Sequence, residues 1–193
     1  VDLLNDPNTA SRLFKTALEN NHENTINAIV ALNVLKQEIV QYLFEEAAGT
    51  KTRKEKIELL LRSQAKNLID LNKPQLGSGE TVFHEMVVRL GDLDLARTLL
   101  IAGANPNIPS TKLLKGTPLI EAMYGNKYKS TEKGAAAIRF LLAQPAIDLE
   151  AKDKNGSTAL IAAAGNHEIV ELLLKKAPNW ASIMIRITTA SIM

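Results

Sequence analysis

The sequence predicts an all-α solenoid, in which helix-turn-helix pairs stack side by side and short turns project between them. Three segments share a pattern of a threonine, a short first helix and a leucine-rich second helix. Their threonines, Thr81, Thr117 and Thr158, are separated by 36 and 41 residues. A period of this length with two helices inside it is typical of a solenoid. Aromatic residues make up only 4% of the chain, so the core must consist of small aliphatic side chains that suit closely packed helices.

Composition excludes several classes of protein. Of the 193 residues, 46% are hydrophobic and 23% are charged, which is ordinary for a globular protein and excludes disorder of the whole chain. Cysteine is absent, which excludes disulfide frameworks, thiolate zinc sites and cysteine nucleophiles. The 23 basic residues nearly balance the 21 acidic ones, so the strong basic field of a nucleic-acid binder is missing.

The chain is also expected to be free of membrane-spanning and secretory segments. No apolar run approaches the roughly 18–20 residues that span a bilayer, and the first residues do not form a basic and apolar signal peptide. We therefore expect a soluble, cytoplasmic protein, and a monomer. The start at Val1 is compatible with an excised fragment, and the apolar end, 180–193, either folds back as a helix or continues in a longer protein.

Local signals support the helical pairs. A threonine hydroxyl can cap the first helix of each repeat by accepting a hydrogen bond from a free N–H group. Pro118 follows Thr117 at the first helical position, where its missing N–H costs nothing. Gly103 follows a second helix and can adopt the positive φ that ends it. Second helices such as 93–100 and 169–174 are apolar at helical spacing.

These segments resemble the ankyrin repeat. That pattern joins Gly-x-Thr-Pro-Leu-His-x-Ala to a first helix, a turn, a second helix ending in Leu-Leu, and Gly-Ala-Asp-x-Asn. The clearest matches lie at 153–174, which contains Gly156-Ser-Thr158-Ala-Leu160, and at 79–107, which places His84 in the histidine position. The resemblance covers residues 70–179 and implies the ankyrin fold, with three clear repeats.

All three repeats depart from the pattern, more in the turns than in the helices. The repeat 79–107 carries Val82 in place of proline and one extra residue before Gly91. The repeat 115–150 carries about ten extra residues in 124–134, and the last repeat is about two residues short near 165–166. Such changes alter local loop shape rather than the fold.

The first third of the chain is helical and diverged. Amphipathic helices are expected at 11–18, 23–32, 35–47 and 53–65, with a turn at Asn20, Asn21 and His22. Residues 39–72 end like a degenerate repeat, and 9–35 could form another. We therefore divide the chain into an N-terminal helical region, 1–69, and a repeat region, 70–193, with a C-terminal helix.

Candidate chemistry is sparse. The resemblance implies that the ring of His84 hydrogen-bonds the backbone of neighbouring turns, while His167 opens a second helix and His22 is expected to be solvated. Neither a phosphate-binding loop nor a Gly-x-Ser-x-Gly element is present. We expect no catalytic residue, no metal and no cofactor, hence no enzyme.

The resemblance implies that function resides in exposed positions of the projecting turns and of the first helices, which face a concave groove. The insertion near 124–134 combines tyrosines with lysines, a pairing found in recognition surfaces but also in tolerated surface loops. Leu113 and Leu114 either form an apolar tip or tuck under the neighbouring repeat. The candidate partner-binding residues are Glu85, Arg89, Lys112, Leu113, Leu114, Glu121, Tyr124, Lys127, Tyr128, Lys154 and Asn155.

The expected function is therefore non-catalytic protein binding through the concave face and the loop tips. The alternative is a regulatory or targeting region of a larger protein, such as a bacterial effector acting in a host cytosol. Two weaker alternatives are that the chain is a small enzyme, or that it binds nucleic acid through the lysines of the insertion.

Overall fold

A computed structural model describes residues 6–112, 114–124 and 132–177. The chain divides into two compact units, one formed by 1–73 with 101–103, the other by 74–100 and 104–193. Helices and turns account for the described residues, and no strand occurs among them.

Between residues 6 and 73, the first unit contains four α-helices and a short 3₁₀ helix: α1 (Pro7–Glu19), α2 (Glu23–Ala31), α3 (Gln37–Ala48), α4 (Arg53–Arg62) and η2 (Gln64–Leu68). These confirm the four helices expected at 11–18, 23–32, 35–47 and 53–65. The turn between α1 and α2 is also where the sequence predicts it, with Asn21 at a φ of 57°. His22 is exposed in this turn, as expected.

Apolar packing and a few long-range polar contacts hold the first unit together. Phe14, Ile26 and Phe44 are among its fully buried side chains. The buried amide of Gln41 on α3 fixes the segment after η2, since its Oε1 accepts a hydrogen bond from the N–H of Asp70 at 2.8 Å. This pairing satisfies polar groups that would be costly to bury alone.

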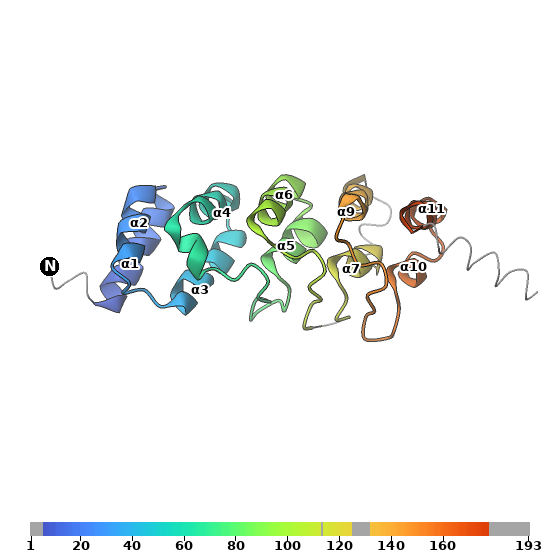
Figure 1. The fold of residues 1–193 in the computed structure, drawn as a ribbon, viewed down its shortest axis with the longest axis horizontal. Coiled ribbons are helices and arrows are strands. Elements are labelled where there is room, and N and C mark those ends of the chain that lie inside the picture. The colour runs from blue at the N-terminus through green and yellow to red at the C-terminus, as the bar shows by residue number, and fades with distance from the viewer. Residues whose placement is uncertain (1–5, 113, 125–131, 178–193) are drawn as a thin grey trace, which may run out of the picture. The chain divides into compact units, whose positions relative to one another are not determined.

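The described part of the second unit contains three helical pairs (Figure 1). In each pair a short first helix precedes a longer second helix, and the first helices form one layer while the second helices form another (Figure 1). The pairs are α5 (Val82–His84) continuing into η3 (Glu85–Leu90), followed by α6 (Leu93–Ala102); α7 (Pro118–Tyr124) with α9 (Glu132–Ala143); and α10 (Ala159–Ala162) with α11 (His167–Lys176).

Helix starts follow the sequence signals in two of the three pairs. The hydroxyl of Thr81 accepts a hydrogen bond from the N–H of His84 at 3.1 Å, and Thr117 receives a longer one from Ile120 at 3.5 Å. Pro118 is the first residue of α7, as predicted. The predicted cap at Thr158 is wrong, because its side chain makes no capping hydrogen bond to α10.

The extra residue before Gly91 is accommodated inside the helix rather than in the turn. Residues Glu85–Leu90 form a π-helix, and Gly91 ends it with a φ of 66°. A π-turn holds one more residue than an α-turn, so a single insertion can be absorbed without moving either helix end.

Candidate protein-binding surface

A projecting loop precedes each of the three helical pairs of the second unit (Figure 1). We name these loops loop 1 (74–80), loop 2 (110–116, of which residue 113 is outside the described residues) and loop 3 (152–157). Each loop is closed by one backbone hydrogen bond across its base. These bonds run from the N–H of Gln75 to the C=O of Glu80 (2.8 Å), from Ser110 to Gly116 (3.0 Å) and from Asp153 to Ser157 (3.0 Å).

Backbone hydrogen bonds also join each loop to the next. The N–H of Thr111 in loop 2 donates to the C=O of Gly79 in loop 1 at 2.7 Å. The N–H of Lys154 in loop 3 donates to the C=O of Leu114 in loop 2 at 2.9 Å. The three loops therefore form one connected row whose links run through main-chain atoms.

Gly79 is required where loop 1 meets loop 2. Its φ is +74°, a backbone conformation that residues with a Cβ rarely adopt. A Cβ at this position would lie 2.6 Å from Oγ1 of Thr111 and 2.8 Å from Cγ of Lys112. Both backbone conformation and close packing thus demand glycine.

We expect Gly79→Ala to lower the free energy of unfolding by about 2–3 kcal/mol, because it adds a steric overlap to the cost of a positive φ. The matched control is Gly156→Ala, where φ is +79° but no atom lies within 4 Å of the added Cβ. That control should cost only about 1 kcal/mol. Urea unfolding followed by circular dichroism measures both, and equal losses would show that the close approach to loop 2 contributes nothing.

Loop 3 is organised by the side chain of Asp153, which is buried. Its Oδ1 accepts hydrogen bonds from the N–H groups of Asn155 at 2.8 Å and Ser157 at 2.9 Å. Desolvation raises the pKa of Asp153, but these backbone N–H groups, the Tyr124 hydroxyl and the charge of Lys154 together lower it below its ordinary value of 3.8. The ionised carboxylate therefore stabilises the folded loop.

A depressed carboxyl pKa makes stability depend on pH. Below about pH 5 the unfolded chain binds protons before folded Asp153 does, so the free energy of unfolding falls as pH falls through the folded pKa. Asp153→Asn keeps an oxygen acceptor for the loop but cannot titrate. We expect a shallower decline of stability between about pH 5 and pH 3 in this variant, measured by urea unfolding at each pH. An identical decline in both proteins would contradict this assignment.

The predicted surface residues fall into four groups. Lys112, Lys154 and Asn155 are exposed on loops 2 and 3, and Nζ of Lys112 reaches back to the carbonyl oxygens of Leu76 and Gly77. Leu114 is partly buried and Tyr124 ends α7. Leu113, Lys127 and Tyr128 lie outside the described residues.

Glu85, Arg89 and Glu121 form the fourth group, on the first helices. Glu85 is partly buried, and its carboxylate accepts a hydrogen bond from the side-chain amide of Gln75 at 3.0 Å. Half of the Arg89 side chain is exposed, whereas only 12% of the Glu121 side chain is exposed. Glu121 therefore points mainly into the protein.

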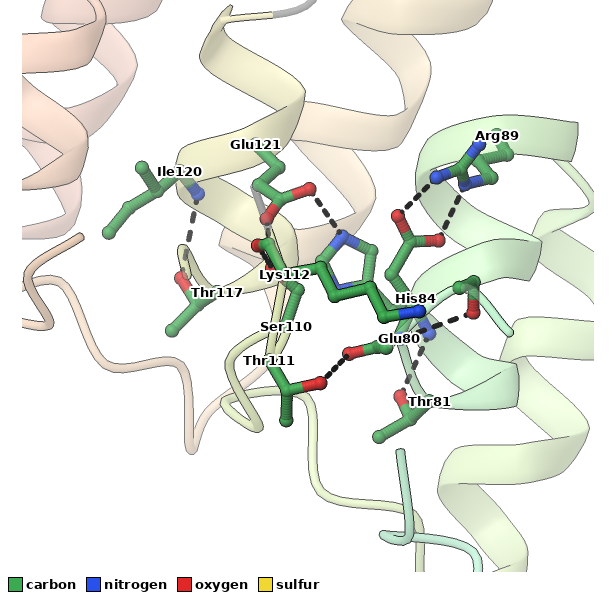
Figure 2. Close-up of polar contacts among 12 residues, drawn as sticks. Glu80, Thr81, His84, Arg89, Ser110, Thr111, Lys112, Thr117, Ile120 and Glu121 are labelled. Carbon is green, nitrogen blue, oxygen red and sulfur yellow. Dashed lines mark hydrogen bonds and ion pairs between the residues drawn. The ribbon is translucent and has the colours of Figure 1, made fainter. Parts of the chain in front are cut away.

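A buried cluster of ionisable residues connects the first two repeats (Figure 2). Arg89 donates two hydrogen bonds of 2.6 Å to the buried carboxylate of Glu80. His84 is 0% exposed, and its Nε2 lies 3.3 Å from Oε2 of Glu121, an ion-pair distance that does not meet hydrogen-bond geometry. The other oxygen of Glu121 accepts a hydrogen bond from the hydroxyl of Ser110 at 2.5 Å.

The environment of Glu121 favours its ionised form. Burial raises the pKa of this carboxyl. Four interactions outweigh burial and bring the pKa below its ordinary value: the contact with the His84 ring, the Ser110 hydroxyl, the electrostatic effect of His84 and the N–H of Gly116. The carboxylate is thus held as an anion beside an imidazole.

The expected backbone partners of His84 are wrong. Neither Nδ1 nor Nε2 forms a hydrogen bond, and the nearest charged partner is the Glu121 carboxylate of the next repeat. Sequence reasoning also missed Glu80 and Ser110. No local signal could have identified them, because the chain brings them to His84 and Glu121 only by folding.

Stacked helical pairs with projecting loops define a helical-repeat protein. The chain belongs to the ankyrin-repeat family, since a family model of three ankyrin repeats matches residues 83–183. This confirms the resemblance and the all-α solenoid expected from the sequence. No curated protein matches the chain significantly. Ankyrin repeats generally serve as protein–protein interaction modules. None of the described helices is both long and apolar enough to cross a membrane.

Proposed function

We propose that the chain binds a partner protein through the tips of loops 1–3 and the exposed positions of the first helices, without catalysis. The connected row of loops carries this proposal, because backbone hydrogen bonds fix the frame and leave the tip side chains to a partner. Leu76 at the tip of loop 1 is 88% exposed, and Ile161 on α10 is 59% exposed. Exposed apolar side chains on a fixed frame are suited to burial in an interface.

Charge indicates the chemistry of the partner. Loops 2 and 3 carry the exposed lysines Lys112, Lys115, Lys152 and Lys154. The acidic side chains of the row, Glu80 and Asp153, are buried and accept hydrogen bonds from Arg89 and from the backbone of loop 3. The solvent-facing surface of the loops is therefore cationic, and the partner surface should present carboxylates around an apolar centre.

Site-specific photo-crosslinking tests the location of binding. A photoreactive phenylalanine is placed in turn at Leu76, Lys115 and Asn155, and at Glu171 on the exposed side of α11 as the matched control. After irradiation in cell lysate, one partner should be crosslinked from the three loop positions and not from Glu171. Crosslinking from Glu171 alone would overturn the proposal.

Charge reversal then tests the chemistry. We expect Lys115→Glu with Lys154→Glu to weaken binding of the crosslinked partner about tenfold, mainly through a slower association rate. Lys175→Glu with Lys176→Glu on α11 makes the same change in net charge away from the loops. Equal weakening by both pairs would mean that only the total charge matters.

A further inference from the structure

Among the residues that the structure describes, the buried imidazole of His84 finds no hydrogen-bond partner for either nitrogen. Leaving a buried polar group unpaired costs about 1–3 kcal/mol, so such a group calls for a specific explanation. Two carboxylates flank this ring, Glu80 from its own repeat and Glu121 from the next (Figure 2). One ligand atom from each of the three residues lies within 4.8 Å of the other two.

We propose that Glu80, His84 and Glu121 bind a divalent transition-metal ion, with zinc as the best fit, that clamps the first two ankyrin repeats together. One imidazole with two carboxylates is a donor set that zinc accepts, at bond lengths of about 2.0–2.2 Å. Tetrahedral ligands at these lengths are separated by about 3.3–3.6 Å. The separation of 3.3 Å between Nε2 of His84 and Oε2 of Glu121 already meets this requirement.

The neighbours of the two carboxylates fit such a site. Metal-binding carboxylates are commonly held in place by hydrogen bonds from surrounding residues. Arg89 holds Glu80 through both oxygens, and Ser110 holds the oxygen of Glu121 that does not face His84. A carboxylate oxygen has two lone pairs, so each retains acceptor capacity for a cation. Water can supply the fourth ligand along Glu121, the one ligand that is partly exposed.

The role of the ion would be structural. Glu80 precedes α5 and His84 is the last residue of α5, whereas Glu121 lies on α7. The stability of a repeat array depends on the interfaces between neighbouring repeats. An ion bound to both repeats would therefore stabilise the folded chain, and the melting temperature would rise with the logarithm of the free ion concentration above the dissociation constant.

The test uses the full chain stripped with a chelator and titrated with zinc chloride by calorimetry. We expect one zinc ion per chain, a rise in melting temperature on zinc addition, and no rise with magnesium. Cobalt in place of zinc should show the visible absorption of tetrahedral N and O ligation. No uptake of zinc by the wild-type chain would overturn the proposal, leaving His84 and Glu121 as an ion pair alone.

Variants locate the ion. Glu121→Gln and His84→Gln preserve side-chain size and should each weaken zinc binding by at least tenfold, and Arg89→Gln by about 10–100-fold. The matched control is His167→Gln with Glu168→Gln, an exposed histidine–glutamate pair on α11 that should leave zinc binding unchanged. Loss of binding in the control but not in His84→Gln would overturn the proposal.

If the buried variants unfold, X-ray absorption of the zinc-loaded wild type tests the site instead. One imidazole among oxygen ligands is expected. Ligation by two or more imidazoles would contradict the proposed site.

Discussion

Phe83→Ala is expected to lower the free energy of unfolding by about 3–5 kcal/mol. Phe83 lies on α5 with 1% of its surface exposed and is one of the largest fully buried side chains. Replacement by alanine removes its apolar contacts and leaves a cavity that short helices can close only in part. Urea unfolding monitored by circular dichroism measures the loss.

Leu76→Ala provides the control, because Leu76 is 88% exposed on loop 1 of the same unit. It should change stability by less than about 0.5 kcal/mol. A loss below about 1 kcal/mol for Phe83→Ala would mean that Phe83 does not belong to a tightly packed core.

Arg89→Met is expected to cost about 3 kcal/mol, because it leaves the Glu80 carboxylate buried without its guanidinium partner. Glu80 is 3% exposed, whereas half of the Arg89 side chain is exposed to water. The two side chains of this ion pair therefore differ in burial. Glu80→Gln should cost only about 1 kcal/mol, since the remaining guanidinium can be hydrated.

Unfolding of both variants and of the double variant, in chelator-containing buffer, gives the coupling energy of the pair. If Glu80→Gln lowered the free energy of unfolding more than Arg89→Met, burial of the carboxylate would not be the main cost of breaking the pair. Thermal unfolding should rank the variants in the same order.

Local sequence signals predicted those parts of the fold that short-range physics determines. Pro118 and Thr81 mark helix starts because the free N–H groups of a first turn need partners or proline. The helices of the first unit were predictable from apolar spacing. The extra residue before Gly91 was visible in the sequence, but its accommodation as a π-helix depends on how firmly packing fixes both ends of the segment.

The buried cluster could not be predicted in the same way. Glu80 and Glu121 are separated by an entire repeat and meet at His84 only after the repeats stack. The family pattern suggested a backbone partner for His84, yet the structure places a carboxylate there. Repeat-to-repeat contacts of this kind depend on side chains that the pattern leaves variable.

The links between the loops also bear on how this protein could acquire new specificities. Each link uses main-chain atoms, from Thr111 to Gly79 and from Lys154 to Leu114. Substitution of exposed residues such as Leu76, Lys152 and Asn155 therefore leaves the links intact. The loop row can therefore diversify under selection without a matching loss of the ability to fold. A library randomised at these three positions should retain its helical circular dichroism and yield binders for unrelated targets.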